Sequence, residues 1–510
     1  MHQTNLNAFN CHESFAFFES ELFKDVQTQG VFPDSKTFTD SVPKQPIHKI
    51  LTNYQQERKS NTGFVLQDFV LANFIIPDTL EITIDSPSTD INQQIEKLWL
   101  ALEKPADKLT NTSLLPLANP YVVPGGRFRE IYYWDSYFSA LGLIKSHKTK
   151  LVMSMLDNFV DLQRRFDCIP NGNRSYYLSR SQPPILGLLV ELLLPFQSEP
   201  ISFIKKYIDA ITKEYEFWMQ GSDDLTDEKS EHRRVVKLPD GSFLNRYWDD
   251  SDTPRPESYR EDIELLNDFK PDNESEFFRN IRAACESGWD FSSRWLADPQ
   301  SLATIRTTRI LPVDLNCLLF KVESLLGHYF EILSDEFLSS KYKDLALKRK
   351  IAINRYFWST KTNYFMDYDL DKKTNSPVLS MAGILPLFVE LADEHQAKWI
   401  SDAIKIQFLK PGGLVTTCVE NTQQWDAPNG WAPLHWFAVV GLHNYQHDEL
   451  ANTIKHRWTK TIDVYFKSTG KLMEKYNVCQ QTQKAVGGEY DVQEGFGWTN
   501  GVYQAMSGED

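Results

Sequence analysis

Apolar side chains recur at helical spacing along most of the chain, and this periodicity restricts the possible folds more than any other feature. The clearest helix carries large residues at positions i, i+3, i+4, i+7, i+11 and i+14, namely Ile204, Tyr207, Ile208, Ile211, Tyr215 and Trp218. Such spacing places the side chains on one face of a helix. The pattern returns with Leu450, Ile454, Trp458, Ile462 and Tyr465.

Further helices are predicted where similar segments lie between polar loops or loops with Gly and Pro. They cover 136–146, 149–166, 183–195, 275–296, 313–334, 340–357, 379–392, 395–408 and 431–445. Alternation typical of strands is scarce, and its weak candidates are "VLQDFVLANF" near residue 65 and "YFMDYDL" at 364–370. No sequence repeat is evident at the spacings expected of common solenoid proteins. Ten or more helices of differing sequence suit an all-α helical toroid.

The first 65 residues differ from the rest because turn-forming residues interrupt them, as in "VFPDSKTFTDSVPKQP". We expect residues 1–65 to form an extension packed on the main body and residues 66–510 to form one helical domain. A chain of 510 residues would on average hold about three domains, but large all-helical enzymes exceed that average.

The charge and hydropathy of the chain exclude two classes of partner. The net charge is −15 and no run of Lys or Arg occurs, which argues against nucleic-acid binding. The longest apolar run, at 183–196, is too short to cross a bilayer and contains Glu191. We therefore expect neither a nucleic-acid partner nor insertion into a membrane.

Two features of the sequence indicate a cytoplasmic protein. The N-terminal residues show no basic region, no clean apolar core and no small-residue cleavage site of a standard signal peptide. The six cysteines are scattered without CxxC or metal-finger spacing, so we expect reduced thiols. The cysteines are Cys11, Cys168, Cys285, Cys317, Cys418 and Cys479.

Seven loop stretches combine aromatic rings with carboxylates, arginines and carboxamides. They are 125–138, 169–184, 252–262, 286–295, 423–433, 472–478 and 487–501. A sugar stacks its C–H faces on aromatic rings, and its hydroxyls need planar partners such as Arg, Asp, Glu and Asn. For a single stretch, ordinary packing at the edge of the core is the better interpretation. Seven in one chain favour a carbohydrate pocket.

Hydrolysis of a glycosidic bond requires one protonated and one ionised carboxyl group. Asp290 in "SGWDFSSRW" is a candidate for the acid, because apolar rings crowd it and Gly288 leaves room for a substrate. A helix N-cap is an equally good interpretation of Asp290. The competing carboxylates are Glu130, Asp135, Glu257, Asp426, Glu474, Glu489 and Glu494. By default, Glu474 would be a surface partner of Lys475.

Sites for a metal or a cofactor are not indicated by the sequence. The histidines show neither HxH nor HExxH, and His443 and His447 are four residues apart without an obvious third ligand. The GxSxG elbow, the phosphate-binding loop and the GxGxxG motif after a strand do not occur. We expect chemistry that uses carboxylates and water, with no metal and no cofactor.

Two stretches, "PGGRFREIYYWDSYF" (124–138) and "QWDAPNGWAP" (424–433), resemble the signature sequences of the trehalases, glycoside hydrolase family 37. The resemblance continues in the family's order through "IPNGNRSYYLSRSQPP", "RPESY", "SGWDFSSRW", "EKY" and "EGFGWTNG". It covers residues 22 to 505, nearly the whole chain. It implies an (α/α)6 toroid that hydrolyses α,α-trehalose to two glucose molecules with inversion, here as a cytoplasmic bacterial enzyme.

The resemblance also assigns roles to individual residues. It implies that Asp290 is the general acid and Glu474 the general base. It further implies a substrate site lined by Arg127, Phe128, Trp134, Asp135, Asn171, Arg180, Gln182, Arg255, Glu257, Gly288, Trp425 and Glu489. Arg127, Arg180 and Arg255 would bind sugar hydroxyls, and buried arginines need acidic partners. We expect Glu130, Asp135 and Glu257 to supply them.

Three positions depart from the family's usual pattern. The glycine run before Glu489 is reduced to "AVGGEY", Asp167 stands where glycine is common, and Asn477 where aspartate is usual. They bear on loop dynamics and pH optimum rather than on the reaction.

We expect a monomer with trehalose as its small-molecule partner. Two alternatives remain, an inverting α-glucosidase for another disaccharide and a catalytically silent trehalose-binding protein.

Overall fold

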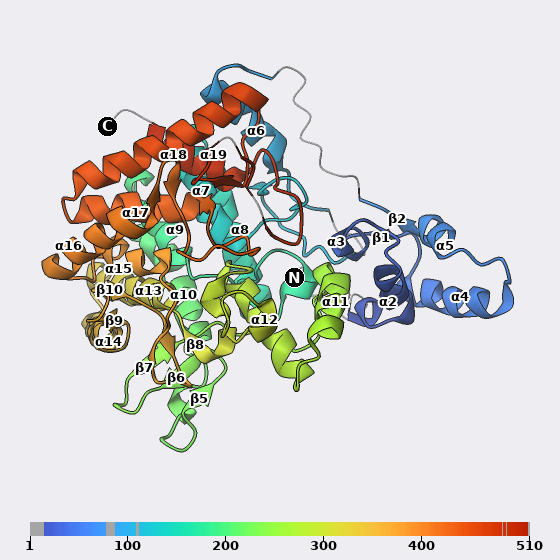
Figure 1. Cartoon of the computed structure of the whole chain (residues 1–510), viewed down its shortest axis with the longest axis horizontal. Coiled ribbons are helices and arrows are strands. Elements are labelled where there is room, and N and C mark those ends of the chain that lie inside the picture. Colours follow the sequence, from blue (N-terminus) through green and yellow to red (C-terminus); the bar gives the residue numbers. More distant parts are fainter. Residues whose placement is uncertain (1–14, 78–86, 109–111, 482, 486, 508–510) are drawn as a thin grey trace.

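The structure of the protein, a computed structural model, describes residues 15–77, 87–108, 112–481, 483–485 and 487–507. Two concentric layers of helices form the main body (Figure 1). Six helices contact one another in sequence order around an inner ring, which closes where the last packs on the first. They are α7 (Tyr133–Lys145), α9 (Leu186–Leu193), α13 (Val313–Ile332), α15 (Leu385–Phe388), α17 (Ala432–Asn444) and α19 (Gly497–Ser507).

An outer helix lies against the ring next to each inner one. The outer helices are α6 (Ile91–Leu102), α8 (Thr149–Phe166), α10 (Pro200–Trp218), α14 (Glu336–Tyr356), α16 (Glu394–Ala403) and α18 (Asp448–Thr469). Nearly every residue of α7 is buried, whereas α8 and α18 bury a single face. The difference is expected, because an inner helix is packed on both sides and an outer helix on one side only. The (α/α)6 toroid inferred from the sequence is confirmed.

Short antiparallel strands connect the helices and shape the loops above the ring. They are β1 (Val42–Pro43) with β2 (Phe74–Ile75), β3 (Glu103–Lys104) with β4 (Tyr121–Val122), β5 (Glu231–His232) with β6 (Val235–Lys237) and β7 (Phe243–Asn245), β8 (Ile310–Leu311) with β11 (Tyr368–Asp369) and β12 (Thr374–Asn375), β9 (Trp358–Ser359) with β10 (Tyr364–Phe365), β13 (Leu409–Lys410) with β14 (Gly413–Leu414), and β15 (Asn429–Trp431) with β16 (Lys475–Asn477).

Two of the sequence-based predictions differ from the structure, and a third agrees with it. The helix predicted over 275–296 is α12 (Glu274–Ser287), which ends because Gly288 adopts a left-handed conformation with φ of 75°. The segment "VLQDFVLANF" mainly forms α5 (Leu66–Asn73), and only its end enters β2, so the strand prediction was wrong there. The strands expected in "YFMDYDL" are present as β10 and β11.

The N-terminal helices form a separate apolar cluster beside the toroid (Figure 1). They are α2 (Glu21–Thr28), α3 (Ser35–Thr39), α4 (Ile47–Ser60) and α5, and α11 (Tyr259–Phe269) of the main body packs against α2 and α3. The cluster includes Phe69 and Phe74, beyond residue 65. Tyr132, Tyr176 and Tyr177 of the main body also belong to this cluster.

A buried group of charges joins this extension to the main body. The Lys36 ammonium lies 2.7 Å from Asp40 and 2.7 Å from Glu130, and it donates to the Tyr176 hydroxyl at 2.9 Å. Arg174 lies 3.2 Å from Glu130 and 3.4 Å from Asp40. Burial favours the neutral acid at Asp40, but the two cations hold its pKa below the usual value. Arg129 also lies 3.7 Å from Asp40, so three cations surround the two carboxylates.

Lys36→Met is expected to lower the free energy of unfolding by about 3 kcal/mol, because it removes a buried cation that lies 2.7 Å from each of two buried carboxylates. Chemical denaturation measures the loss. The matched control is Lys49→Met in the exposed part of α4, which should change stability by less than about 0.5 kcal/mol. Equal stability of the two variants would contradict the interpretation of Lys36 as a charge that joins the two parts.

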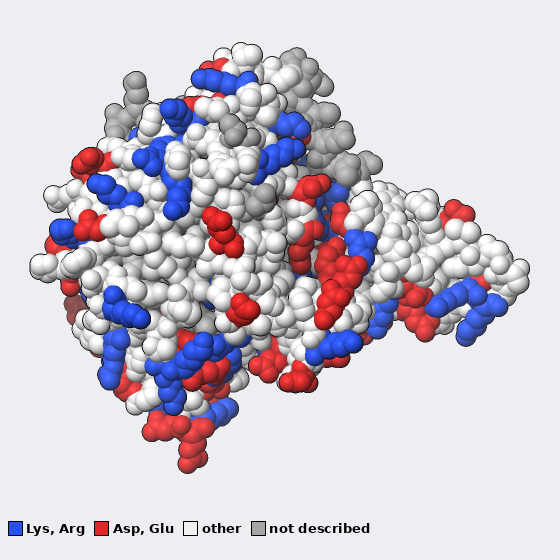
Figure 2. Space-filling view, viewed as in Figure 1, with Lys and Arg blue, Asp and Glu red and all other residues white. Residues whose placement is uncertain are grey.

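Charged side chains of both signs are interspersed over the face of the molecule shown in Figure 2. No helix among the described residues is long and apolar enough to cross a membrane.

Candidate active site

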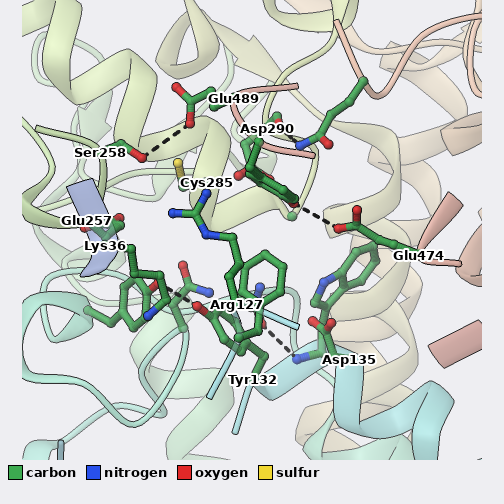
Figure 3. Close-up of a pocket in the computed structure, with 18 of the residues that line it drawn as sticks. Lys36, Arg127, Tyr132, Asp135, Glu257, Ser258, Cys285, Asp290, Glu474 and Glu489 are labelled. Atoms are coloured by element: carbon green, nitrogen blue, oxygen red, sulfur yellow. Dashed lines mark hydrogen bonds between the residues drawn. The ribbon is translucent and has the colours of Figure 1, made fainter. Parts of the chain in front are cut away.

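One cavity collects every residue that the sequence assigns to the site (Figure 3). They are Arg127, Phe128, Trp134, Asp135, Asn171, Arg180, Gln182, Arg255, Glu257, Gly288, Asp290, Trp425, Glu474 and Glu489. Most come from the loops that precede the inner helices α7, α9, α17 and α19. Because these helices begin at the same end of the toroid, loops far apart in sequence converge there.

Asp290 follows α12 after a turn that only glycine fits. A Cβ atom on Gly288 would lie 2.7 Å from Cε2 of the Trp134 indole, and the left-handed backbone adds a second restriction. The N-cap interpretation of Asp290 is wrong, because the next helical turn is capped by the hydroxyl of Ser292. The Asp290 carboxyl is therefore free to face the cavity, where it keeps partial contact with solvent.

Stacked tryptophans make the surroundings of this carboxyl apolar. Trp289 stacks on Trp425 at 5.3 Å between ring centroids, and Trp425 stacks on Trp431 at 3.9 Å. Burial and the nearby Glu489 raise the pKa of Asp290 to about 7, against the opposing effect of Arg255. Apolar burial thus outweighs the arginines, as the sequence analysis required of a general acid.

Glu474 lies at the start of β16 and is buried, so its interpretation as a surface partner of Lys475 was wrong. Its Oε1 accepts a hydrogen bond from the Tyr490 hydroxyl at 2.9 Å. Its Oε2 is buried and has no hydrogen-bond partner among the described residues; the Lys475 ammonium lies 3.8 Å away. Burial raises the pKa of Glu474, while Lys475 and Tyr490 oppose that rise. One oxygen is thus held and the other remains available.

Carboxylates fix two of the guanidinium groups that face the cavity, those of Arg180 and Arg255, but only one of the three expected partners is among them. Arg180 pairs with Glu257 at 2.7 Å, as expected. Arg255 pairs instead with Asp262 at 2.6 Å and with Glu489 at 2.7 Å. These pairs leave little freedom to either guanidinium, so each presents its remaining N–H groups in a fixed direction.

The other two expected acidic partners have different roles. Glu130 pairs with the buried cations Lys36 and Arg174 rather than with an arginine of the cavity. Asp135 pairs with no arginine in the described chain, and burial raises its pKa well above the usual range, helped by Glu474. A neutral carboxyl can donate a hydrogen bond as well as accept one.

A loop before α19 closes over the cavity and carries two site residues. The Glu489 carboxylate reaches Arg255, and the Tyr490 ring lies 4.8 Å from the Arg127 guanidinium. Gly488 has φ of 103°, and a Cβ atom there would lie 2.8 Å from Gln424 Oε1. The loop can pass this close to Gln424 because its residue 488 has no side chain.

The cavity also contains residues that the sequence analysis did not single out. They are Lys36, Tyr132, Tyr177, Ser258, Cys285, Gln424, Trp431, Tyr490, Phe496 and Trp498. Most lie inside the seven aromatic and charged stretches, so the sequence around them already indicated the pocket. Lys36 and Cys285 lie outside those stretches.

The histidine pair considered for a metal site lies apart from the cavity. The His443 ring nitrogen lies 2.6 Å from Asp448 at the surface, as a pair between neighbouring helices. Within the described residues, no group of three His, Cys, Asp or Glu side chains could hold a metal ion. Of the cysteines, Cys168, Cys285, Cys317, Cys418 and Cys479 are free thiols.

Comparisons with known proteins agree on one family. The model of the family described as Trehalase matches residues 30–507. Periplasmic trehalases of Escherichia coli and Shigella flexneri are 45% identical to this chain over 486 residues, which is 95% of this chain and 85% of each relative. These relatives contradict the expected cytoplasmic localisation and the cytoplasmic bacterial type. The N-terminal residues and the scattered cysteines were too weak a basis for that expectation.

Solved structures share the toroid. The neutral trehalase of Saccharomyces cerevisiae is 27% identical, with a TM-score of 0.62 over 76% of this chain and 73% of the yeast chain. A mannosylglycerate hydrolase of glycoside hydrolase family 63 from Thermus thermophilus is 16% identical, with a TM-score of 0.55 over 82% of this chain and 99% of its own. The second likeness concerns the fold alone.

Proposed function

Because the chain belongs to the trehalase family, we propose that Asp290 and Glu474 act as general acid and general base in its hydrolysis of α,α-trehalose to two glucose molecules. The observation that carries the proposal is the pairing of these two carboxyls in one cavity lined by arginines and tryptophans (Figure 3). The pKa of Asp290 is about 7, and Glu474 has a buried oxygen with no hydrogen-bond partner in the part of the chain that the structure describes.

The reaction is a single displacement at the anomeric carbon, in which each of the two carboxyls transfers one proton. Asp290 donates its proton to the glycosidic oxygen as the C–O bond breaks. Glu474 takes a proton from water, through Oε2, as the water oxygen bonds to the anomeric carbon from the opposite face. The attack from the opposite face inverts the configuration at that carbon. No cofactor takes part in these steps.

Recognition of the sugar is assigned to groups already fixed by the protein. Arg127, Arg180 and Arg255 present N–H donors to hydroxyls. The second oxygen of Glu257 is buried without a partner among the described residues, so a sugar hydroxyl could donate to it. The remaining polar contacts are assigned to Asp135, Asn171, Gln182 and Glu489, and the apolar faces to Phe128, Trp134 and Trp425, with Gly288 leaving them room.

The N-terminal extension is proposed to be part of the site, although its core is separate. Lys36 lines the cavity, and Thr39 donates to the backbone carbonyl of Pro256 at 2.7 Å. The turn that begins at Pro256 carries Glu257. We therefore expect the extension of residues 1–65 to support the sugar site on the domain of residues 66–510. A monomer would suffice, because one chain supplies every assigned residue.

The pH dependence of kcat/KM is expected to be bell-shaped. The acid works only when protonated, so activity falls about ten-fold per unit as the pH rises above 7, the pKa of Asp290. The base works only when ionised, so activity also falls below the pKa of Glu474, which burial raises above its usual value. Initial rates of glucose release across pH 4 to 9 measure both limbs. A flat profile between pH 6 and 9 would exclude Asp290 as the acid.

Glucose release from trehalose and from maltose tests the function itself. Rapid hydrolysis of trehalose with little hydrolysis of maltose is expected. Equal or faster hydrolysis of maltose would favour an α-glucosidase with another substrate. Binding of trehalose without glucose release would favour a silent binding protein. Retention of both carboxyls argues against that alternative, because binding alone requires neither an acid nor a base.

A further inference from the structure

Lys475 is a buried cation that the two-carboxyl mechanism leaves without a role. Its side chain has no exposed surface, and its ammonium lies 3.8 Å from Glu474 Oε2. The ammonium also lies over the Trp431 ring at 5.1 Å and near the Tyr490 ring at 5.6 Å. Placing a charge away from water is costly unless a partner compensates it. Among the described residues, Glu474 is the carboxylate within ion-pair distance.

Gln424 connects this cation to the loop of the acid. The Lys475 ammonium donates to Gln424 Oε1 at 2.6 Å, and Gln424 Nε2 donates to the backbone carbonyl of Asp290 at 2.5 Å. The backbone carbonyl of Gln424 accepts from Asn429 and from the Trp431 indole, each at 3.0 Å. Gln424 is therefore held in place, and it links the Lys475 ammonium, which lies beside Glu474, to the backbone of Asp290.

The carboxyl pair carries one negative charge throughout the proposed reaction. Before reaction Glu474 is ionised and Asp290 is protonated. Afterwards Glu474 holds the proton from water, and Asp290 has given its proton to the leaving sugar. The charge thus moves from the base to the acid, while the total charge of the pair stays at −1.

We propose that Lys475 is a positioning residue that neutralises this single negative charge, whichever of the two carboxyls carries it. It thereby stabilises the charged site both before and after the charge has moved. The inference rests on the proposed roles of Asp290 and Glu474. It assigns to Lys475 no contact with the substrate.

Other charged groups near the two carboxyls already have partners or act on one of them. The arginines closest to Asp290 are committed, because Arg255 pairs with Asp262 and Glu489, and Arg180 with Glu257. Glu474 also faces Tyr490, Arg127 and Asp135. Burial lowers the pKa of Lys475, whereas the charges of Glu474 and Asp290 oppose that lowering.

The pH profile of Lys475→Met tests the inference. Methionine preserves the stem against Trp431 but removes the charge, so the pKa of both carboxyls should rise. We expect kcat to fall about ten-fold or more, and both limbs of the kcat/KM profile to move to higher pH by about one unit. Lys475→Arg keeps the charge and should keep the limbs in place. The control Lys467→Met changes an exposed lysine of α18 and should match the wild type.

A purely structural role would lower the amplitude of the profile without moving it. Unmoved limbs in Lys475→Met, or an equal shift in Lys475→Arg, would overturn the inference. If Lys475→Met does not fold, Lys475→Gln serves as the uncharged variant with the same expected shift and the same contrary result. Wild-type protein that releases no glucose from trehalose would instead count against the proposed function.

Discussion

Asp290→Asn lowers kcat for trehalose by about 1,000-fold or more, because the amide cannot donate a proton to the leaving sugar. The substitution preserves the size of the side chain and its place beneath the tryptophan stack. Binding of trehalose should therefore change little. Glucose release measures the loss, and calorimetry with trehalose measures the binding.

A substrate that needs no acid separates this role from damage to the site. Fluoride leaves α-glucosyl fluoride without protonation, so Asp290→Asn should retain much of the wild-type rate on it. Asp272→Asn, an exposed position outside the cavity, is the matched control and should behave as the wild type. Equal losses on trehalose and on the fluoride would count against Asp290 as the acid.

Glu474→Gln removes the base and is expected to lower kcat by a similar factor, about 1,000-fold or more, on both substrates. Water must be activated whichever group leaves, so the loss of rate should be as large on α-glucosyl fluoride as on trehalose. The glutamine can still accept from Tyr490, which should preserve the loop over the cavity. Rates on the two substrates, measured side by side, distinguish the two variants.

A small anion provides the complementary test of the base. Glu474→Ala leaves space beside the anomeric carbon, and azide needs no base to attack. With α-glucosyl fluoride, azide should restore turnover and yield β-glucosyl azide, the inverted product. The control Glu494→Gln lies in the same C-terminal region, with its carboxylate partly exposed, and should keep normal rates. Normal turnover of trehalose by Glu474→Gln would refute the assignment.

Local sequence could predict the helices but not their partners in three dimensions. The periodicity of 204–218 and 450–465 corresponds to α10 and α18, since an outer helix buries one face. The end of α12 at Gly288 was missed, because "SGWDFSSRW" reads as a helix until the left-handed glycine is known. The roles of Asp290 and Glu474 came from family resemblance and remain to be tested by the variants above.

The environment of the charged residues depended on segments distant in sequence. Glu474 beside Lys475 is typical of a surface pair, but both are buried, and the pairing of β15 with β16 places Lys475 against Trp431. Asp262 was not considered as the partner of Arg255, because the two meet only when α11 folds back on its preceding turn. The buried pairing of Glu130 with Lys36 likewise joins the extension to the body.

Because α7 and α19 close the inner ring, the active site is completed only late in the synthesis of the chain. A chain emerging from the ribosome presents the arginine loops and Asp290 early, but Glu474, the loop that covers the cavity and α19 emerge late. The inner ring cannot be complete before α19 has been synthesised. A nascent chain therefore carries Asp290, the proposed acid, before Glu474, the proposed base, and we expect hydrolysis only after the final inner helix has docked.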